Sequence, residues 1–259
     1  MGTSIVHDVG GKGHPLEIRW STDEDLIKIL EWLNEEDRAQ IHGNFLCNWR
    51  LTQQFHENGR LLVLIDKLQA VPVGYQWGQL LQPGILQIRN EWRGKGLGRL
   101  VVEHCVELAQ QQDEAVLLIE CKPASSIPFW KRMGFEIVEG AHGGNAEGYR
   151  VLSKKLELPG NGEPVEVRVS SYPEEKKWKP DTPPLSAFSP TAVRDSDGLI
   201  HLNERAAFIS GGPNGIGDLV IEILMDNAVI YCDKAKYEAA EKHGVQRCEN
   251  GFFVDLVLP

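Results

Sequence analysis

The sequence contains no long run of apolar residues. Every apolar stretch falls short of the roughly 20 residues that a membrane-spanning helix needs. The first residues, 1–14, are polar and contain several glycines, and they lack the apolar segment that follows a basic start in a secretory signal peptide. We therefore expect a cytoplasmic protein with no membrane partner.

Cysteine is scarce as well, with five residues in a chain of 259 and no close pair among them. An odd number without close pairs argues against a disulfide framework and against a cysteine-rich zinc site. The eight histidines also lack the spacing of metal ligands. We expect no metal, and we expect Cys105 and Cys121, which lie in apolar periodic runs, to be small buried side chains.

Positive charge is the third shortage. The chain has 27 Lys and Arg against 37 Asp and Glu, and both the part up to Pro159 and the remainder are acidic. Nucleic-acid-binding proteins normally carry a basic surface, so the balance argues against a nucleic-acid partner. It agrees with a cationic small substrate.

Hydrophobic periodicity predicts both strands and helices over the first 158 residues. A capping box at Ser21–Glu24 is expected to begin the first helix. Strands are expected at 16–20, 61–65, 71–79, 84–88, 115–121, 135–138 and 149–158, and further helices within 38–56, after Gly98 and at 126–132. A strand, a glycine loop, a helix and another strand indicate a parallel crossover in an otherwise antiparallel sheet, so the predicted fold class is α+β (mixed α/β).

The remaining residues change in character. Residues 159–190 contain seven prolines and few large aliphatic side chains, which predicts an extended linker, although 165–170 could form an edge strand. Residues 191–259 alternate strand patterns with a helix expected at 234–243. They predict a small α+β domain that is too small to be very stable alone. It would pack on the first domain or on a second subunit, so a homodimer stays open.

A glycine-rich loop between a strand and an amphipathic helix carries the clearest chemical signal. It runs Arg93-Gly94-Lys95-Gly96-Leu97-Gly98. Backbone amides at a helix N-terminus bind phosphate well, and glycines let the backbone approach the ligand closely. The loop lacks the Gly-Lys-Ser/Thr ending of a Walker loop, and no repeated βαβ series surrounds it as in a dinucleotide fold. Taken alone, the pattern would also fit a structural turn.

Two segments together resemble the GNAT superfamily of acetyl-CoA-dependent N-acetyltransferases. Residues 87–98 resemble the family's acetyl-CoA loop, and Phe129-Trp130-Lys131-Arg132-Met133-Gly134-Phe135 resembles its Phe-Tyr-x-x-x-Gly-Phe segment. The resemblance covers about residues 16–158. It implies a GNAT domain at 14–158, whose mixed central sheet splays between its fourth and fifth strands. The linker at 159–190 and a small domain of unknown role at 191–259 lie outside it.

The resemblance also implies how acetyl-CoA is bound as a co-substrate. The backbone of Leu86 and Ile88 would bond the pantetheine and acetyl group. Phe129 and Trp130 would flank the CoA chain, and Ser126 is a further candidate for binding it. The pyrophosphate would lie on the loop residues, namely Arg93, Gly94, Lys95, Gly96, Leu97, Gly98 and Arg99.

The residues that would move protons are less clear. Trp130 stands where the family often has the tyrosine that protonates the CoA thiolate, and indole is a poor proton donor. Ser125, Ser126 and Tyr149 are alternative donors. For the base that deprotonates the amine, Glu120 at the end of a buried strand is the first candidate and Glu91 the second, while a solvated or ion-paired carboxylate is the alternative for both. His56 is a further candidate for the base, because the intrinsic pKa of histidine suits this role, and a surface histidine is the alternative.

These observations predict a cytoplasmic N-acetyltransferase that moves an acetyl group from acetyl-CoA directly to a primary amine of a small molecule. One alternative acceptor is a protein or an aminoacyl-tRNA. Another alternative is a non-catalytic acyl-CoA-binding module in which the C-terminal region is the output domain.

Overall fold

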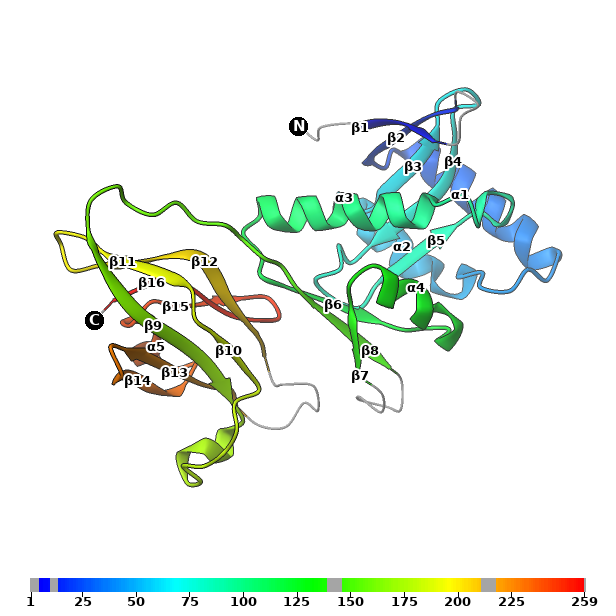
Figure 1. Cartoon of the computed structure of the whole chain (residues 1–259). Helices are drawn as coiled ribbons and strands as arrows, with labels where there is room; N and C mark the ends of the chain where they lie inside the picture. The colour runs from blue at the N-terminus through cyan, green and yellow to red at the C-terminus, as the bar shows by residue number, and fades with distance from the viewer. Residues whose placement is uncertain (1–4, 10–13, 139–145, 211–217, 259) are drawn as a thin grey trace. The chain divides into compact units, whose positions relative to one another are not determined.

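The computed structural model describes residues 5–9, 14–138, 146–210 and 218–258 (Figure 1). The chain forms two compact units, residues 1–111 and 112–259. Both contain helices and strands, so the predicted α+β class is confirmed. Within the described residues, no helix is long and apolar enough to cross a membrane.

The first unit is a five-stranded antiparallel sheet in the order β1-β2-β3-β4-β5. The sequence analysis missed its first strand, β1. In chain order the elements are β1 (Ile5–Val9), β2 (His14–Trp20), α1 (Asp23–Arg38), η1 (Leu46–Asn48), α2 (Trp49–Glu57), β3 (Leu62–Asp66), β4 (Val71–Trp77), β5 (Ile85–Ile88), η2 (Asn90–Trp92) and α3 (Leu97–Gln111).

Both faces of this sheet are covered, because its central strands are apolar on both sides. Ile29, Trp32 and Leu33 of α1 pack with alternate residues of β3 and β4, and residues of α2 complete that cluster. On the other face, α3 lies against β4 and β5, and Cys105 donates a hydrogen bond from Sγ to Oε1 of Gln76 at 3.5 Å. Cys105 is fully buried, as expected, and burial raises the pKa of its thiol to about 12.

The first helix begins one residue later than predicted. Its N-cap is Thr22, whose Oγ1 accepts from the Asp25 amide at 3.4 Å, while the Asp25 carboxylate accepts from the Thr22 amide at 2.8 Å. The capping box is therefore Thr22–Asp25 instead of Ser21–Glu24. Asp25 also forms an ion pair with Arg19 of β2, a contact that a solvent-exposed Glu24 does not make.

The second unit contains two sheets. Three strands make an antiparallel sheet in the order β6-β8-β7, and eight make a larger one in the order β14-β13-β9-β11-β12-β16-β15, with β10 paired to β9. The elements are β6 (Val116–Glu120), η3 (Ala124–Ser126), α4 (Ile127–Arg132), β7 (Glu136–Val138), β8 (Glu147–Val151), β9 (Glu163–Tyr172), η5 (Glu174–Lys177), β10 (Ser186–Phe188), β11 (Thr191–Arg194), β12 (Ile200–Ile209), β13 (Val220–Met225), β14 (Ala228–Lys234), α5 (Glu238–Glu241), β15 (Val245–Cys248) and β16 (Gly251–Val257).

Residues 159–190 contain part of the larger sheet and do not form the extended linker that the proline content predicts. Strand β9 pairs with β13 along 167–172 and with β11 along 163–166, so it is an interior strand and not the edge strand allowed above. The prolines do not prevent this, because Pro164 lies near the start of β9 and Pro173 follows its end.

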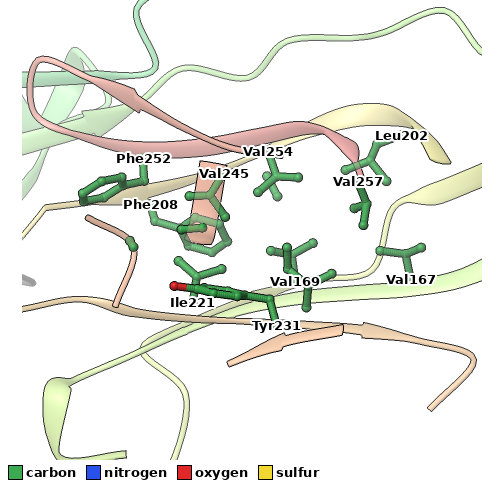
Figure 2. Close-up of a cluster of buried hydrophobic side chains, with 14 of the residues drawn as sticks. Val167, Val169, Leu202, Phe208, Ile221, Tyr231, Val245, Phe252, Val254 and Val257 are labelled. Atoms are coloured by element: carbon green, nitrogen blue, oxygen red, sulfur yellow. The ribbon is translucent and has the colours of Figure 1, made fainter. Parts of the chain in front are cut away.

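The larger sheet encloses its own apolar core, shown in Figure 2. Val167 and Val169 of β9 and Ile221 of β13 face Phe208 of β12 and Val254 of β16 across this core. Cores of this kind are the main favourable contribution to folding, so this region has an independent source of stability.

Two strand and helix boundaries in this region also differ from the sequence prediction. The strands expected at 199–202 and 206–209 form one strand, β12, whose pairing with β16 changes register between His201 and Ala206. The helix expected at 234–243 is only α5, because residues up to Lys234 pair with β13 instead.

Arg205 of β12 joins the larger sheet to the segment that leads into β6. Its Nε and Nη2 donate to the two carboxylate oxygens of Asp255 at 2.8 and 2.6 Å, and Nη2 also donates to Oδ1 of Asp113 at 2.9 Å. The guanidinium lies 3.7 Å from the ring centroid of Phe253. Ala115 and Val116 pack beside it on Ala207 and Phe253, so the start of β6 is part of the same packed body as the C-terminal strands.

Candidate functional site

The site begins at the edge strand β5, which pairs only with β4 among the described strands. Arg89, just beyond β5, donates from its amide to the Val73 carbonyl at 2.9 Å. Alternation along an antiparallel ladder then directs the backbone groups of Leu86 and Ile88 away from β4. Both residues predicted to bond the pantetheine therefore present backbone groups along this edge, where the Ile88 carbonyl accepts from Nε of Arg93 at 2.9 Å.

The glycine loop follows directly. Gly94 and Gly96 have φ values of 76° and 82°, in the left-handed region that favours glycine. A Cβ built on either residue would meet no atom within 4 Å. Both glycines are therefore required by backbone conformation, and open space lies beside them that a phosphate group could enter.

The loop leads into the N-terminus of α3. The Leu100 amide donates to the Gly96 carbonyl at 3.2 Å, as the first turn of the helix forms. The preceding amides of Leu97, Gly98 and Arg99 have no acceptor within the helix, and the helix dipole favours an anion at this end. The backbone thus provides the donor set that the sequence predicts for a pyrophosphate.

Two cationic side chains flank these amides. The Lys95 ammonium lies 4.6 Å from the centroid of the Trp92 ring, and Lys95 is exposed. Arg99 is exposed too and forms an ion pair with Glu103 at 2.6 Å, one turn further along α3. An exposed i,i+4 pair of this kind is weak, so Arg99 can exchange it for a phosphate oxygen.

Arg93 is held differently. Its Nε donates to the carbonyl of Ile88 at 2.9 Å, and its two terminal nitrogens donate to the carbonyls of His42 and Gly43 at 2.8 and 3.3 Å. One of these nitrogens also lies 4.0 Å from a carboxylate oxygen of Glu36. The guanidinium of Arg93 thus contacts the segment between α1 and α2.

A buried polar network underlies this part of the site, and the sequence analysis missed it. The Glu36 carboxylate accepts from the Asn90 amide at 2.7 Å and from Nε2 of Gln87 at 3.3 Å. Oε1 of Gln87 accepts from the Tyr75 hydroxyl at 3.0 Å and from the Phe45 amide at 3.1 Å. Burial raises the pKa of Tyr75, so the phenol stays protonated as the donor. The sequence does contain a signal for this network. Glu36 lies seven residues after Ile29, which places its carboxylate on the buried, apolar face of α1.

Two candidates for proton transfer, Glu91 and His56, lie in the first unit, and each has a charged partner. Glu91 is exposed and forms an ion pair with Arg89 at 3.2 Å. The His56 ring lies between Ser21 Oγ, 2.7 Å from Nδ1, and Asp23 Oδ1, 2.9 Å from Nε2. His56 therefore connects the end of α2 to the start of α1. Its role as a base has no further support, and Glu91 stays a prediction.

Glu120, Ser126, Phe129 and Trp130 belong to the second unit. Glu120 ends β6 and forms an ion pair with Lys122 at 2.9 Å, and its side chain is 32% exposed. An ion-paired carboxylate is the alternative to a desolvated base at this position, and the structure contains such a pair. Whether Glu120 also takes a proton stays a prediction.

Trp130 lies in an aromatic cluster on α4. Its ring centroid is 5.0 Å from that of Phe129 and 5.3 Å from that of Phe135, both in edge-to-face geometry, and the residue is buried. Such pairs stabilise packing beyond the area that they bury. Trp130 is therefore a core residue of this segment, and its predicted contact with CoA stays a prediction.

The alternative proton donors have different surroundings. Ser125 is exposed, whereas the hydroxyl of Ser126 is buried and makes no hydrogen bond to another described residue. The Tyr149 hydroxyl donates to the Glu147 carboxylate at 3.0 Å. Burial and this carboxylate raise the pKa of Tyr149 to about 12, so its proton is retained at neutral pH and already has an acceptor.

One family model matches part of the chain. Residues 57–137 match the family model described as "Acetyltransferase (GNAT) domain", which spans β3 to β7 and includes the glycine loop and α4. The remaining residues match no part of that model, and a search of curated protein sequences found no match.

Solved structures to which part of this chain is similar include three acetyltransferases or acetyltransferase-like proteins. A GNAT-family acetyltransferase from Listeria monocytogenes has 14% identity and a TM-score of 0.45, with 57% of this chain and 100% of that chain covered. The PaiA N-acetyltransferase from Thermoplasma acidophilum, in complex with coenzyme A, has 14% identity and a TM-score of 0.38, covering 53% and 99%. A mosquito arylalkylamine N-acetyltransferase-like protein has 12% identity and a TM-score of 0.41, covering 53% and 100%.

Proposed function

We propose, on the premise that residues 57–137 are an acetyltransferase (GNAT) domain, that this chain transfers the acetyl group of acetyl-CoA directly to the primary amine of a small molecule. The observation that carries the proposal is the continuous surface formed by the edge of β5 that does not pair with β4, the open loop at Gly94 and Gly96, and the N-terminus of α3. Acetyl-CoA needs both parts of this surface, because its pantetheine amides bond to strand edges and its pyrophosphate bonds to helix N-termini.

The residues of the loop would supply binding and orientation. The amides from Gly94 to Arg99 and the cations of Lys95 and Arg99 would neutralise the pyrophosphate. Acetyl-CoA, when bound, supplies a thioester carbon that an amine can attack without an acyl-enzyme. The new C–N bond forms as the C–S bond breaks, and the thiolate takes a proton.

Proton removal from the incoming ammonium is the step that needs a side chain. We propose Glu120 for this role and keep Glu91 as the second candidate, because both are carboxylates with some solvent access. Each is ion-paired, so the base would first have to release Lys122 or Arg89. General-base catalysis by a positioned carboxylate typically contributes about 10²–10⁴-fold to the rate.

The acceptor is proposed from charge. The chain has a formal net charge of −10, which favours cationic small amines over nucleic acids. We keep a protein or aminoacyl-tRNA acceptor as the rival substrate class and a non-catalytic acyl-CoA-binding module as the rival function. A cytoplasmic location and a homodimer formed through residues 191–259 remain parts of this proposal.

The first test is a thermal-shift titration of the full chain with acetyl-CoA, CoA and longer acyl-CoAs. A ligand that binds the native state raises the melting temperature, and at one ligand concentration a higher affinity gives a larger rise. The acyl-CoA that raises it most is then used with a panel of amines, and release of free CoA thiol is followed. A shift without amine-stimulated release would favour the binding module, and no shift at millimolar ligand would contradict both.

A further inference from the structure

The side chain of Arg93 has a geometry that differs from that of the other cations near the loop. All three of its guanidinium nitrogens donate to backbone carbonyls. Nε donates to Ile88 at the end of β5, and the two terminal nitrogens donate to His42 and Gly43 between α1 and α2. Gly43 has a φ of 75°, and a Cβ there would lie 3.7 Å from a terminal nitrogen of Arg93. The 42–43 segment thus follows a glycine-dependent path beside the guanidinium.

These bonds keep Arg93 away from a phosphate. To reach the N-terminus of α3, the guanidinium would have to leave three acceptors and the nearby Glu36 carboxylate, 4.0 Å away. Lys95 is exposed over Trp92, and Arg99 has only a surface ion pair, so neither has a comparable set of bonds to lose. The planar fork of arginine reaches carbonyls of separate segments from three nitrogens, whereas a lysine donates from a single nitrogen.

Two further contacts hold the same stretch of chain from the same direction. Arg89 forms an ion pair with Glu35 at 3.3 Å, and the Asn90 amide donates to Glu36 at 2.7 Å. Residues 89, 90 and 93 are therefore all bonded to the end of α1 or to the segment after it. These contacts hold the start of the glycine loop against this part of the chain.

We propose that Arg93 is a positioning residue which fixes the glycine loop to the 42–43 segment and does not itself bind the pyrophosphate. This inference rests on the proposed function, because it assigns a role within the acetyl-CoA site. The proposal divides the cations near the loop into two groups. Lys95 and Arg99 bind the phosphates, whereas Arg93 donates hydrogen bonds to backbone carbonyls. It also couples the loop to the connection between α1 and α2, so a ligand that moves residues 42–45 will change acetyl-CoA affinity.

The test compares three variants of the full chain: Arg93→Ala, Arg93→Lys and the matched control Lys95→Ala. The first measurement is amide hydrogen exchange without ligand. Useful reporters are the amides of Ile41 and Phe45, which donate to the Glu36 carbonyl at 2.9 Å and to Gln87 at 3.1 Å. We expect exchange on the order of ten-fold faster at these amides in both Arg93 variants and unchanged exchange in Lys95→Ala.

The second measurement is the affinity for acetyl-CoA as a function of salt concentration. Exposed charge pairs are screened by salt, so loss of a phosphate contact reduces the salt dependence. We expect Lys95→Ala to reduce it. Arg93→Ala should weaken binding but keep the salt dependence of the wild type, because no phosphate contact is lost.

Arg93→Lys keeps the positive charge and removes the guanidinium fork, so it separates a positioning role from a charge effect. It also replaces Arg93→Ala in the test if that variant does not fold. Wild-type affinity and wild-type exchange in Arg93→Lys would overturn the proposal, as would reduced salt dependence in Arg93→Ala with unchanged exchange at 41–45. If the wild type binds no acetyl-CoA, the proposed function fails, and the ligand-free exchange data still decide whether Arg93 holds the 42–43 segment.

Discussion

Replacing Arg205 by Met tests whether the C-terminal sheet and the start of β6 are one packed body. The Arg205 side chain is 1% exposed and donates to Asp255 and Asp113, so the substitution removes four hydrogen bonds and leaves two carboxylates without this partner. Breaking a buried pair by removing one partner costs about 3–5 kcal/mol. Asp113 is 54% exposed and also contacts Lys154, so water and Lys154 compensate part of the loss. We therefore expect a decrease of about 3 kcal/mol in the free energy of unfolding.

Urea unfolding followed by far-UV circular dichroism measures this value. With slopes of about 1–3 kcal/mol per molar urea, the midpoint of the transition should fall by roughly 1–3 M. The matched control is Lys155→Met, because Lys155 forms an ion pair with Glu204, next to Arg205, at 3.3 Å and is 82% exposed. A surface pair of this kind contributes at most about 1 kcal/mol. Equal shifts for Arg205→Met and Lys155→Met would refute the reasoning.

The pH dependence gives a second check on the same pair. Hydrogen bonds from Lys154 and Arg205 lower the pKa of Asp113 despite some burial. A carboxyl with a lowered folded-state pKa stabilises the fold above its unfolded pKa, and this stabilisation is lost as the pH falls through the folded value. The difference between wild type and Arg205→Met should therefore shrink below about pH 4. A difference that stays constant to pH 2 would mean that charge is not its source.

Three further outcomes are expected. Gly96→Asp should abolish acetyl-CoA binding, because its carboxylate would occupy the open space proposed for the pyrophosphate and repel it. Gly198→Asp, with a φ of 85° and equally open space, controls for strain of the left-handed backbone in the same thermal-shift titration. Asp25→Asn should lower the free energy of unfolding in urea by about 1–2 kcal/mol at neutral pH and by less below about pH 4. Burial opposes ionisation of Asp25, but hydrogen bonds from Arg19 and Thr22 outweigh it and lower the pKa of this carboxyl. Glu120→Gln should lower kcat by about 100-fold with unchanged acetyl-CoA affinity, and a kcat within two-fold of wild type would remove Glu120 as the base.

The elements of the first unit could be predicted because their periodicity is local. The strands from Leu16 to Ile88 and helix α3 lie within a few residues of their predicted positions, whereas the second helix, expected from Arg38 to His56, spans only Trp49–Glu57. The capping box was displaced by one residue because Ser21 and Thr22 are both good N-caps. Only the tertiary contact from Arg19 to Asp25 distinguishes them, and the sequence does not contain that information in any local pattern.

Strand β9 shows how composition can conceal a pattern. Val165, Val167 and Val169 are buried and alternate with exposed Glu166 and Arg168, so the strand signal was present in the sequence. Proline content over the whole of 159–190 outweighed it in our prediction. Edge and interior strands could not be told apart, because that difference depends on partners more than 20 residues away.

The candidate site was predictable in its backbone and not in its side chains. Gly94 and Gly96 adopt the positive φ values for which a phosphate loop needs glycine, and the motif therefore identified them correctly as loop glycines. No local pattern in the sequence shows that Arg93 points to His42 and Gly43, since 51 and 50 residues separate them. Side-chain roles at this site follow from tertiary contacts, which one sequence alone does not define.

The position of β16 within the larger sheet has a consequence for synthesis on the ribosome. The sheet of the first unit adds its strands in chain order, so each new strand pairs with the one made just before it. Strand β16 lies between β12 and β15, and it pairs with β12 along Ile200–Ile209. Until residues 251–257 have been translated, β12 exposes an unpaired edge beside Phe208, which is the kind of surface that chaperones protect from aggregation. The second unit is therefore expected to fold late, after the glycine loop and α3 have already formed.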